Sequence, residues 1–262
     1  MKFSKILMLA AVFALTACGG NKGSEVDEAK AKEVAKQISA ETAAVKTLEF
    51  TMDMTTTDKD KNTDTSKYVY KLTENGDVFA SASGSSSEGS SSSEFYRVKN
   101  DEYEEVIYYH TVSNTKDSGK DESTVCYGKK GNEITYTTIS ASVGSAAVMS
   151  VEIVYGAVCD PSVIIESAKQ DASMDVKYYS SGDKNLVIEG KFSGTNNSDE
   201  KPIKEATATY TYSNGLLAKI EATTTYEDGE KMTQKAEAKY SGVKISLPDG
   251  WKDIVNKATI TL

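Results

Sequence analysis

Three cysteines carry the most reactive side chains in this chain of 262 residues. Cys18 follows an apolar run near the amino terminus, whereas Cys126 and Cys159 lie far along the chain. A thiol can be acylated, oxidised or bound to a metal, and its surroundings decide which of these occurs. If Cys18 is set aside, an even number of cysteines remains. We therefore expect either a disulfide between Cys126 and Cys159, which requires an oxidising compartment, or two free thiols.

The amino-terminal segment has the pattern of a secretory signal peptide. Lys2 and Lys5 supply positive charge, and residues 6–15 form an apolar run that is too short to cross a bilayer, which takes about 20 residues. The motif Leu15-Thr16-Ala17-Cys18 resembles the lipobox of bacterial lipoproteins. This resemblance implies removal of residues 1–17 and acylation of Cys18, with palmitate among the expected chains. The covalent lipid would then anchor the protein to the extracytoplasmic face of the cell membrane, at the cell surface or in the periplasm.

The rest of the chain divides into a tether, a domain and a tail. Residues 18–23 predict a flexible spacer, because glycine-rich segments behave as random coil. Residues 24–250 predict a single mainly-β domain, and 251–262 a carboxy-terminal tail. Within the domain, residues 81–94 (SASGSSSEGSSSSE) are so poor in apolar side chains that we expect a mobile loop. No later stretch is apolar over 18 residues, so no second membrane element is expected.

The charge and the amino-acid composition limit the classes of molecule that this chain is expected to bind. The formal net charge is −9 at pH 7, and an acidic surface repels phosphates, so no nucleic acid partner is expected. Arg97 is the single arginine, so bidentate clamps for phosphate or carboxylate are nearly absent. The chain has 15 tyrosines, whose rings are apolar and whose hydroxyls are polar.

An amphipathic helix is predicted over residues 25–46, with Ser24 as its N-cap. Its apolar residues recur at helical spacing: Ala31, Val34, Ala35, Ile38, Thr42 and Val45. Such a stripe needs a sheet to cover it, although a helix that is presented to a partner protein remains an alternative.

From residue 48 the apolar period changes to two, which predicts strands. The expected strands lie at 48–55, 68–72, 78–80, 95–98, 106–109, 134–139, 148–155, 174–179 and 186–192, with a short helix from Asp160 to about residue 170. Three longer strands follow over 206–240, joined at Asn214-Gly215 and Asp228-Gly229, and residues 243–248 close the run. The predicted fold class is α+β, mainly antiparallel β, with the amino-terminal helix packed against a curved sheet or half-barrel.

A helix followed by strand 48–54, and a meander over 210–248, resemble the lipoprotein-carrier superfamily that includes LolA, LolB, LppX and LprG. The resemblance implies a hollow between helix and sheet that holds acyl chains, and hence a lipid or other hydrophobic ligand. The candidate groove residues are Phe50, Met52, Met54, Tyr68, Tyr70, Leu72, Tyr210, Tyr212 and Ile220. The alternative is a surface-displayed structural or interaction lipoprotein, for adhesion or assembly, with no small-molecule ligand and with protein partners that the sequence does not identify.

The sequence offers little evidence for catalysis or metal binding. His110 is the single histidine, so no second imidazole is available for a relay, and we expect a protein that is not an enzyme. Asp58, Asp60, Asn62 and Asp64 have the spacing of a calcium loop, but the glycine and glutamate of such loops are missing, which predicts a solvated hairpin loop. No metal or cofactor is expected. The tyrosine pairs 108–109 and 178–179 leave carbohydrate stacking as a further alternative.

Overall fold

The computed structural model describes residues 22–131, 133–139, 155–169, 174–193, 202–255 and 259–260. The signal peptide and Cys18 lie outside these residues. The chain forms two compact units: unit 1 comprises Met1–Val45, Met52–Asp64 and Val154–Ala238, and unit 2 comprises Lys46–Thr51, Thr65–Ile153 and Lys239–Leu262. The predicted domain over 24–250 extends over both units.

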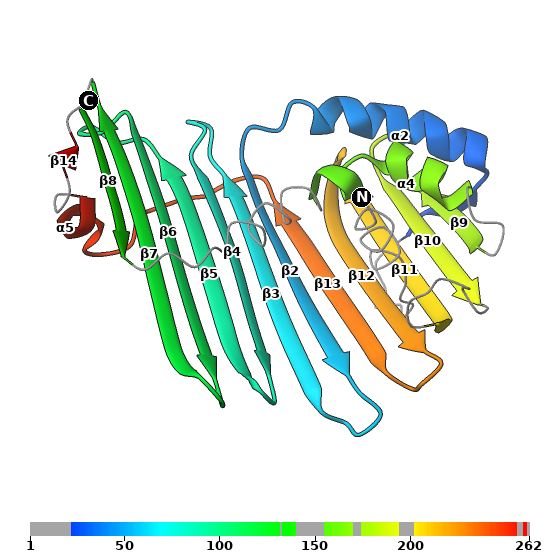
Figure 1. Cartoon of the computed structure of the whole chain (residues 1–262). Coiled ribbons are helices and arrows are strands. Elements are labelled where there is room, and N and C mark those ends of the chain that lie inside the picture. Colours follow the sequence, from blue (N-terminus) through cyan, green and yellow to red (C-terminus); the bar gives the residue numbers. More distant parts are fainter. Residues whose placement is uncertain are drawn as a thin grey trace. The chain divides into compact units, whose positions relative to one another are not determined.

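Unit 1 is built on an antiparallel sheet (Figure 1). Its strands are β1 (Ser24–Val26), β9 (Met174–Ser180), β10 (Leu186–Ser193), β11 (Ile203–Ser213), β12 (Leu216–Tyr226) and β13 (Lys231–Lys239), in that spatial order. The predicted three-stranded meander is confirmed as β11, β12 and β13, whereas residues 243–248, which were expected to close the run, form no strand. Asn214 and Gly215 have φ values of 53° and 82°, as a two-residue hairpin turn requires, and Gly229 has φ 89° in the next turn.

The amino-terminal helix is α2 (Glu28–Thr42). It starts later than predicted, and Ser24 is not its N-cap. Asp27 is the cap, because its Oδ1 accepts a hydrogen bond from the Lys30 N–H at 2.8 Å. Ser24 instead opens the short strand β1, which pairs antiparallel with β9 as far as Val26, so the helix begins only after this strand ends.

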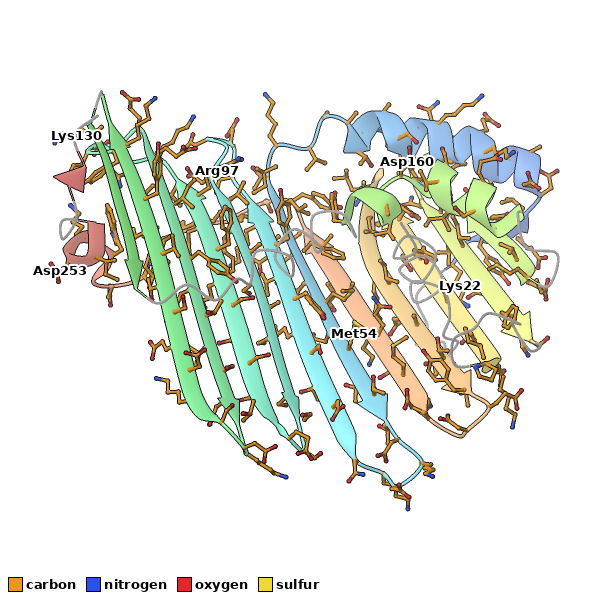
Figure 2. All side chains as sticks on the ribbon, in the orientation of Figure 1. Lys22, Met54, Arg97, Lys130, Asp160 and Asp253 are labelled. Atoms are coloured by element: carbon orange, nitrogen blue, oxygen red, sulfur yellow. The ribbon has the colours of Figure 1, made fainter. Side chains whose placement is uncertain are left out.

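The predicted second helix is confirmed as α4 (Pro161–Lys169), and it packs beside α2. Asp160, labelled in Figure 2, accepts hydrogen bonds from the Ser162 N–H at 2.8 Å and from the Ser39 hydroxyl of α2 at 2.6 Å. Lys32 and Glu166 form an ion pair of 2.6 Å between the same two helices. Polar contacts therefore join α2 to α4 at two places.

Strand β2 (Leu48–Thr57) was predicted, and its residues are divided between the two units. The strands that follow are β3 (Thr63–Leu72), β4 (Val78–Ser86), β5 (Gly89–Val98), β6 (Glu105–Thr115), β7 (Gly119–Lys130), β8 (Glu133–Ile139) and β14 (Thr259–Ile260). From β3 to β14 they neighbour one another in this order, all antiparallel where paired.

The serine-rich segment 81–94 was wrongly expected to be a mobile loop. It forms most of β4 and β5, with the turn at Ser87–Glu88. Ser85 pairs with Ser90, and β5 pairs along its whole length with β6. Backbone ladders on both sides of β5 satisfy its N–H and C=O groups, so the strand forms without a core of its own.

Strand β7 falls in a stretch for which no strand was predicted, because its first residues are Gly-Lys-Asp-Glu-Ser and hide the apolar alternation. Cys126, in the second half of β7, lies in the core of unit 2. The members of this core are Tyr96, Val98, Tyr103, Val106, Tyr108 and Cys126.

The carboxy-terminal segment was wrongly treated as a tail. Helix α5 (Trp251–Val255) places Trp251 and Ile254 against the core of unit 2, together with Ile245 and Leu247 of the preceding stretch. The Trp251 and Tyr103 rings meet edge to face with centroids 5.8 Å apart. These contacts make α5 part of the packed unit. The fold class is as predicted: α+β, mainly antiparallel β, with an amino-terminal helix on a sheet.

Candidate functional site

One face of the unit 1 sheet, its inward face, is lined mainly by buried apolar side chains. Tyr210 pairs with Ile188 on one side and with Ile220 on the other, so the three side chains share one face. We use the name inward face for Leu186, Ile188, Gly190, Phe192, Ala206, Ala208, Tyr210, Tyr212, Leu217, Ile220, Ala222, Thr224, Gln234 and Ala236, all of which are buried. Helix α2 contacts β9, β10 and β12 of this sheet (Figure 1).

Helix α2 turns its predicted apolar stripe into the interior. Ala31, Ala35 and Ile38 are fully buried, and Val34 is 1% exposed. The hydroxyl of Tyr212 donates to the carbonyl of Val158 at 2.7 Å, just ahead of α4. Burial raises the pKa of the Tyr210 phenol above its ordinary value.

The groove candidates from the sequence fall into both units. In unit 1, Tyr210, Tyr212 and Ile220 lie together on the inward face, and Met52 is buried while Met54 is half-buried. In unit 2, Phe50 and Tyr70 are buried, whereas Tyr68 and Leu72 are half-buried. The structure therefore brings Tyr210, Tyr212 and Ile220 together on the sheet that α2 contacts, whereas Phe50, Tyr68, Tyr70 and Leu72 belong to the other unit.

A row of small side chains crosses the inward face and ends at an amide. Gly190 pairs with Ala208, Ala208 with Ala222, and Ala222 with Gln234, so that the row runs over β10, β11, β12 and β13. We call these four residues the small-residue row. Larger side chains flank the row on one side, since Ile188, Tyr210 and Ile220 occupy the neighbouring positions of the same strands.

Gln234 is the polar end of the small-residue row. Its residue exposure is 6%, its Nε2 donates to the Met52 sulfur, and its Oε1 has no hydrogen-bond partner among the described residues. A buried amide oxygen without a partner is rare, because it has lost its hydrogen bonds to water. Gln234 is not among the candidate residues predicted from the sequence, although it is the polar residue in the otherwise apolar series Met232, Gln234, Ala236.

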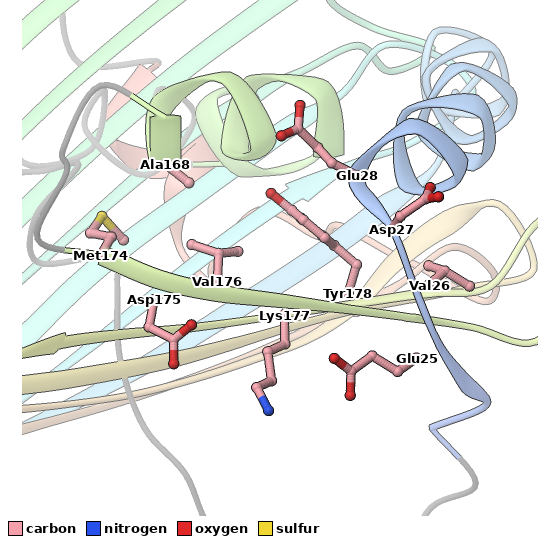
Figure 3. A pocket seen from close by; sticks show the side chains of 10 residues that line it. All are labelled: Glu25, Val26, Asp27, Glu28, Ala168, Met174, Asp175, Val176, Lys177 and Tyr178. Carbon is pink, nitrogen blue, oxygen red and sulfur yellow. The ribbon is translucent and has the colours of Figure 1, made fainter.

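A pocket of about 560 Å³ lies at the outer edge of the same unit (Figure 3). It is lined by β1 and the start of α2, by the end of α4, and by the first residues of β9. Figure 3 shows Val176 and Tyr178 directed toward α4, and Asp175, Lys177 and Glu25 on the opposite side of the strand. Burial raises the pKa of the Tyr178 phenol. Sequence reasoning missed this pocket, because it depends on where β1 ends against β9.

In unit 2, His110 belongs to a row of contacts on one face of the sheet. Its Nδ1 lies 2.9 Å from the Thr124 hydroxyl, and its Nε2 lies 3.7 Å from a Glu122 carboxylate oxygen. The Tyr108 ring stacks on the imidazole, with centroids 6.3 Å apart. Thr124 is only 8% exposed, so these contacts hold the imidazole against the sheet and do not present a hydroxyl nucleophile to solvent.

The adjacent tyrosines do not form stacking pairs. Tyr108 is 7% exposed and packs in the core of unit 2, while Tyr109 is half-buried at the next position of the strand. Tyr178 is buried beside the pocket, while the Tyr179 ring lies under the Lys22 ammonium at 5.6 Å. Consecutive residues of a strand point to opposite faces, and each pair is accordingly divided.

Cys126 and Cys159 are free and buried, in unit 2 and unit 1 respectively. Of the two states that the sequence left open, the structure has the free thiols. Burial raises the pKa of Cys126 to about 11 and also raises that of Cys159, which keeps both thiols protonated and weakly reactive. Within the described ranges, no three histidine, cysteine or acidic side chains are arranged to hold a metal ion.

Comparison with known proteins places the chain in no family. No family model matches it, and no curated protein matches it either. A β-barrel-like protein with a domain of unknown function from Brucella abortus has a TM-score of 0.26 at 8% identity, over 76% of this chain and 99% of its own. A domain assigned to an outer membrane lipoprotein-sorting protein from Vibrio parahaemolyticus has a TM-score of 0.19 at 10% identity, over 87% of this chain and 100% of its own. At these values the resemblance to the carrier superfamily stays a prediction.

Proposed function

We propose that this chain is a lipid-anchored protein outside the cytoplasm that binds an apolar ligand on the inward face of unit 1 and catalyses no reaction. The ligand would lie along the small-residue row, between the sheet and the α2–α4 pair. Gly190, Ala208 and Ala222 place no bulky side chain along this line, which the protein covers in this structure, and the flanking residues Ile188, Tyr210 and Ile220 would supply apolar contact.

The observation that carries the proposal is the buried amide oxygen of Gln234, which has no partner among the described residues. Leaving such an atom unpaired costs about 1–3 kcal/mol. A ligand that is apolar along its length and has one hydroxyl or N–H group near its end would remove this cost. Long-chain alcohols, amides and monoacylglycerols have this chemistry.

Entry of such a ligand requires α2 and α4 to move away from the sheet together. The two helices are joined by Ser39, Asp160 and the Lys32–Glu166 ion pair. Two of the four side chains that α2 buries are alanines, Ala31 and Ala35, and the other two are Val34 and Ile38. Because alanine has little apolar surface, the helix can separate from the sheet at a lower free-energy cost than a leucine-rich helix could.

Membrane anchoring through Cys18 is part of the proposal. No helix in the described part of the chain is long and apolar enough to span a bilayer. Replacing Cys18 by serine should block acylation and release the protein from the membrane fraction, as measured by radiolabelled palmitate incorporation and by sedimentation. Normal processing and membrane sedimentation of Cys18→Ser would refute the anchoring.

The ligand proposal is tested by native mass spectrometry of gently extracted protein and by titration with phenylnaphthylamine, an apolar fluorescent probe with one N–H donor. We expect co-purified lipid and saturable probe binding in the wild type, and at least a fivefold weaker probe affinity in Gln234→Leu. Lys235→Leu is the matched control, because Lys235 is exposed at the next position of β13.

The thermal stability of Gln234→Leu separates the two functions that the sequence left open. If neither protein binds the probe or carries lipid, and Gln234→Leu only raises the melting temperature, then the amide is merely a buried polar group. The proposal would then be wrong, and a surface-displayed interaction lipoprotein would be the better description.

A further inference from the structure

The described residues cover the outer edge of the unit 1 sheet only in part. On one side, β10 pairs with β9 from Met174 to Ser180. On the other side, β1 pairs only with residues 178–180 of β9, because the chain leaves the strand after Val26 to enter α2. Residues 174–177 therefore have no strand beside them on that edge among the described residues. An open strand edge is a template for the backbone of another chain.

The 560 Å³ pocket lies along this open edge (Figure 3). Its two sides differ in chemistry, because successive residues of β9 point to opposite faces. Met174 and Val176 are half-buried on the side of α4, where Ala168 completes an apolar wall. Asp175 and Lys177 are exposed on the other side, near Glu25 of β1.

The charge around the pocket is predominantly negative. Four carboxylates and one ammonium group line it. Asp27 accepts the capping hydrogen bond of α2, and Glu28 forms an ion pair with Lys32 at 3.1 Å. Glu25 and Asp175 lie on the strands that border the open edge, so they would face the side chains of any added strand on that side.

We propose that residues 174–177 of β9 are a strand-addition site for an extended peptide segment of alternating apolar and basic residues. Its backbone pairs with the open edge in the position that a longer β1 would occupy, over about 13 Å for four residues. Its apolar side chains face Met174 and Val176. On the other face a basic side chain lies opposite Asp175 and near Glu25, and Lys177 of the same face favours a small or polar residue opposite itself. The site is separate from the small-residue row.

The test uses the mature full-length protein and a fluorescein-labelled octapeptide of alternating valine and lysine, with anisotropy as the readout of binding. A second peptide of the same sequence has N-methyl groups on its central backbone nitrogens, which removes hydrogen-bond donors and leaves the charge unchanged. We expect at least tenfold weaker binding of the N-methylated peptide, and no binding of a peptide with glutamate in place of lysine.

Charge variants test the assignment of the two faces. Glu25→Gln and Asp175→Asn should each weaken the peptide about two- to fivefold at low salt, as expected for exposed ion pairs. Asp121→Asn removes an exposed carboxylate from β7 in unit 2 and should leave the affinity unchanged. Gln234→Leu should also leave it unchanged, which separates failure of this site from failure of the ligand proposal.

Hydrogen exchange locates the peptide. Saturating peptide should slow exchange in the segment 174–177 at least tenfold, while β7 is unaffected. Equal binding of the N-methylated peptide, protection elsewhere only, or no binding at millimolar peptide would each overturn the proposal. Self-association in sedimentation, together with protection of residues 174–177 from hydrogen exchange in the absence of peptide, would overturn the proposal too, because the edge would then pair with a second copy of this chain.

Discussion

The packing of α5 on unit 2 can be tested through the only tryptophan of the chain. Trp251 is half-buried against Tyr103, which is 7% exposed. We propose Tyr103→Ala as the perturbation and Trp251 fluorescence as the probe. If α5 packs as described, the substitution removes the ring that faces the indole, and Trp251 emission in the folded protein should shift to longer wavelength as water reaches it.

The loss of stability can be worked from burial. A tyrosine ring buries roughly 150–250 Å², and at about 25 cal/mol per Å² this amounts to about 4–6 kcal/mol for complete burial. Neighbouring side chains relax into part of the space, so we expect about 3–5 kcal/mol, as for other aromatic-to-alanine changes in cores. With a urea m value of about 2 kcal/mol/M, the unfolding midpoint seen by Trp251 should fall by roughly 1.5–2.5 M.

The matched control is Tyr179→Ala, which removes a half-buried tyrosine from unit 1. It should leave the emission of folded Trp251 unchanged. If Tyr103→Ala shifts neither the emission nor the midpoint, then α5 does not pack on the core of unit 2, and residues 251–262 are the tail that the sequence predicted.

Three further predictions concern a helix cap, a turn and a buried thiol. Asp27→Ala should destabilise unit 1 by about 1 kcal/mol, whereas Ser24→Ala should be close to neutral in the same urea titration. A larger loss of stability in Ser24→Ala than in Asp27→Ala would show that Ser24 is the cap. Gly215→Ala should lower the free energy of unfolding more than Gly76→Ala does. Both glycines have φ near 80°, so we expect about 1–2 kcal/mol of backbone strain for each, but only a Cβ at Gly215 would lie 2.7 Å from an α2 side chain and add a steric cost. Equal melting temperatures of the two variants would contradict this. Burial raises the pKa of Cys126 from 9.0 to about 11, so between these pH values the folded state retains a proton that the unfolded chain releases. Unit 2 should therefore lose stability as the pH rises from 9 to about 11. In unfolding titrations, Cys126→Ala should lack this part of the pH dependence.

Local patterns in the sequence predicted an element correctly where its structure depends on residues close by in the chain. The alternation of β11 and β12 and the turn residues Asn214 and Gly215 predict a meander, because a hairpin is defined by its turn and by side chains on the same two strands. The same holds for α4, since Asp160 and Pro161 mark a helix start through local hydrogen bonding and a preset φ.

Patterns failed where an element is stabilised by distant partners. Residues 81–94 have few apolar side chains, but β6 supplies a complete backbone ladder for β5. Ser24 has the composition of a cap, but pairing with residue 180 draws it into a strand. Trp251 belongs to the core only because β7 and β8 contact α5.

For the candidate site, the sequence by itself determined which residues are apolar and which alternate with polar ones; it placed Tyr210, Tyr212 and Ile220 on one face. Only the tertiary structure decided that Gly190, Ala208, Ala222 and Gln234 stand side by side. The register between four strands sets that row, and a shift of one residue in any of them would turn its side chain to the opposite face. Register is a property of pairing between strands, and no single strand encodes it.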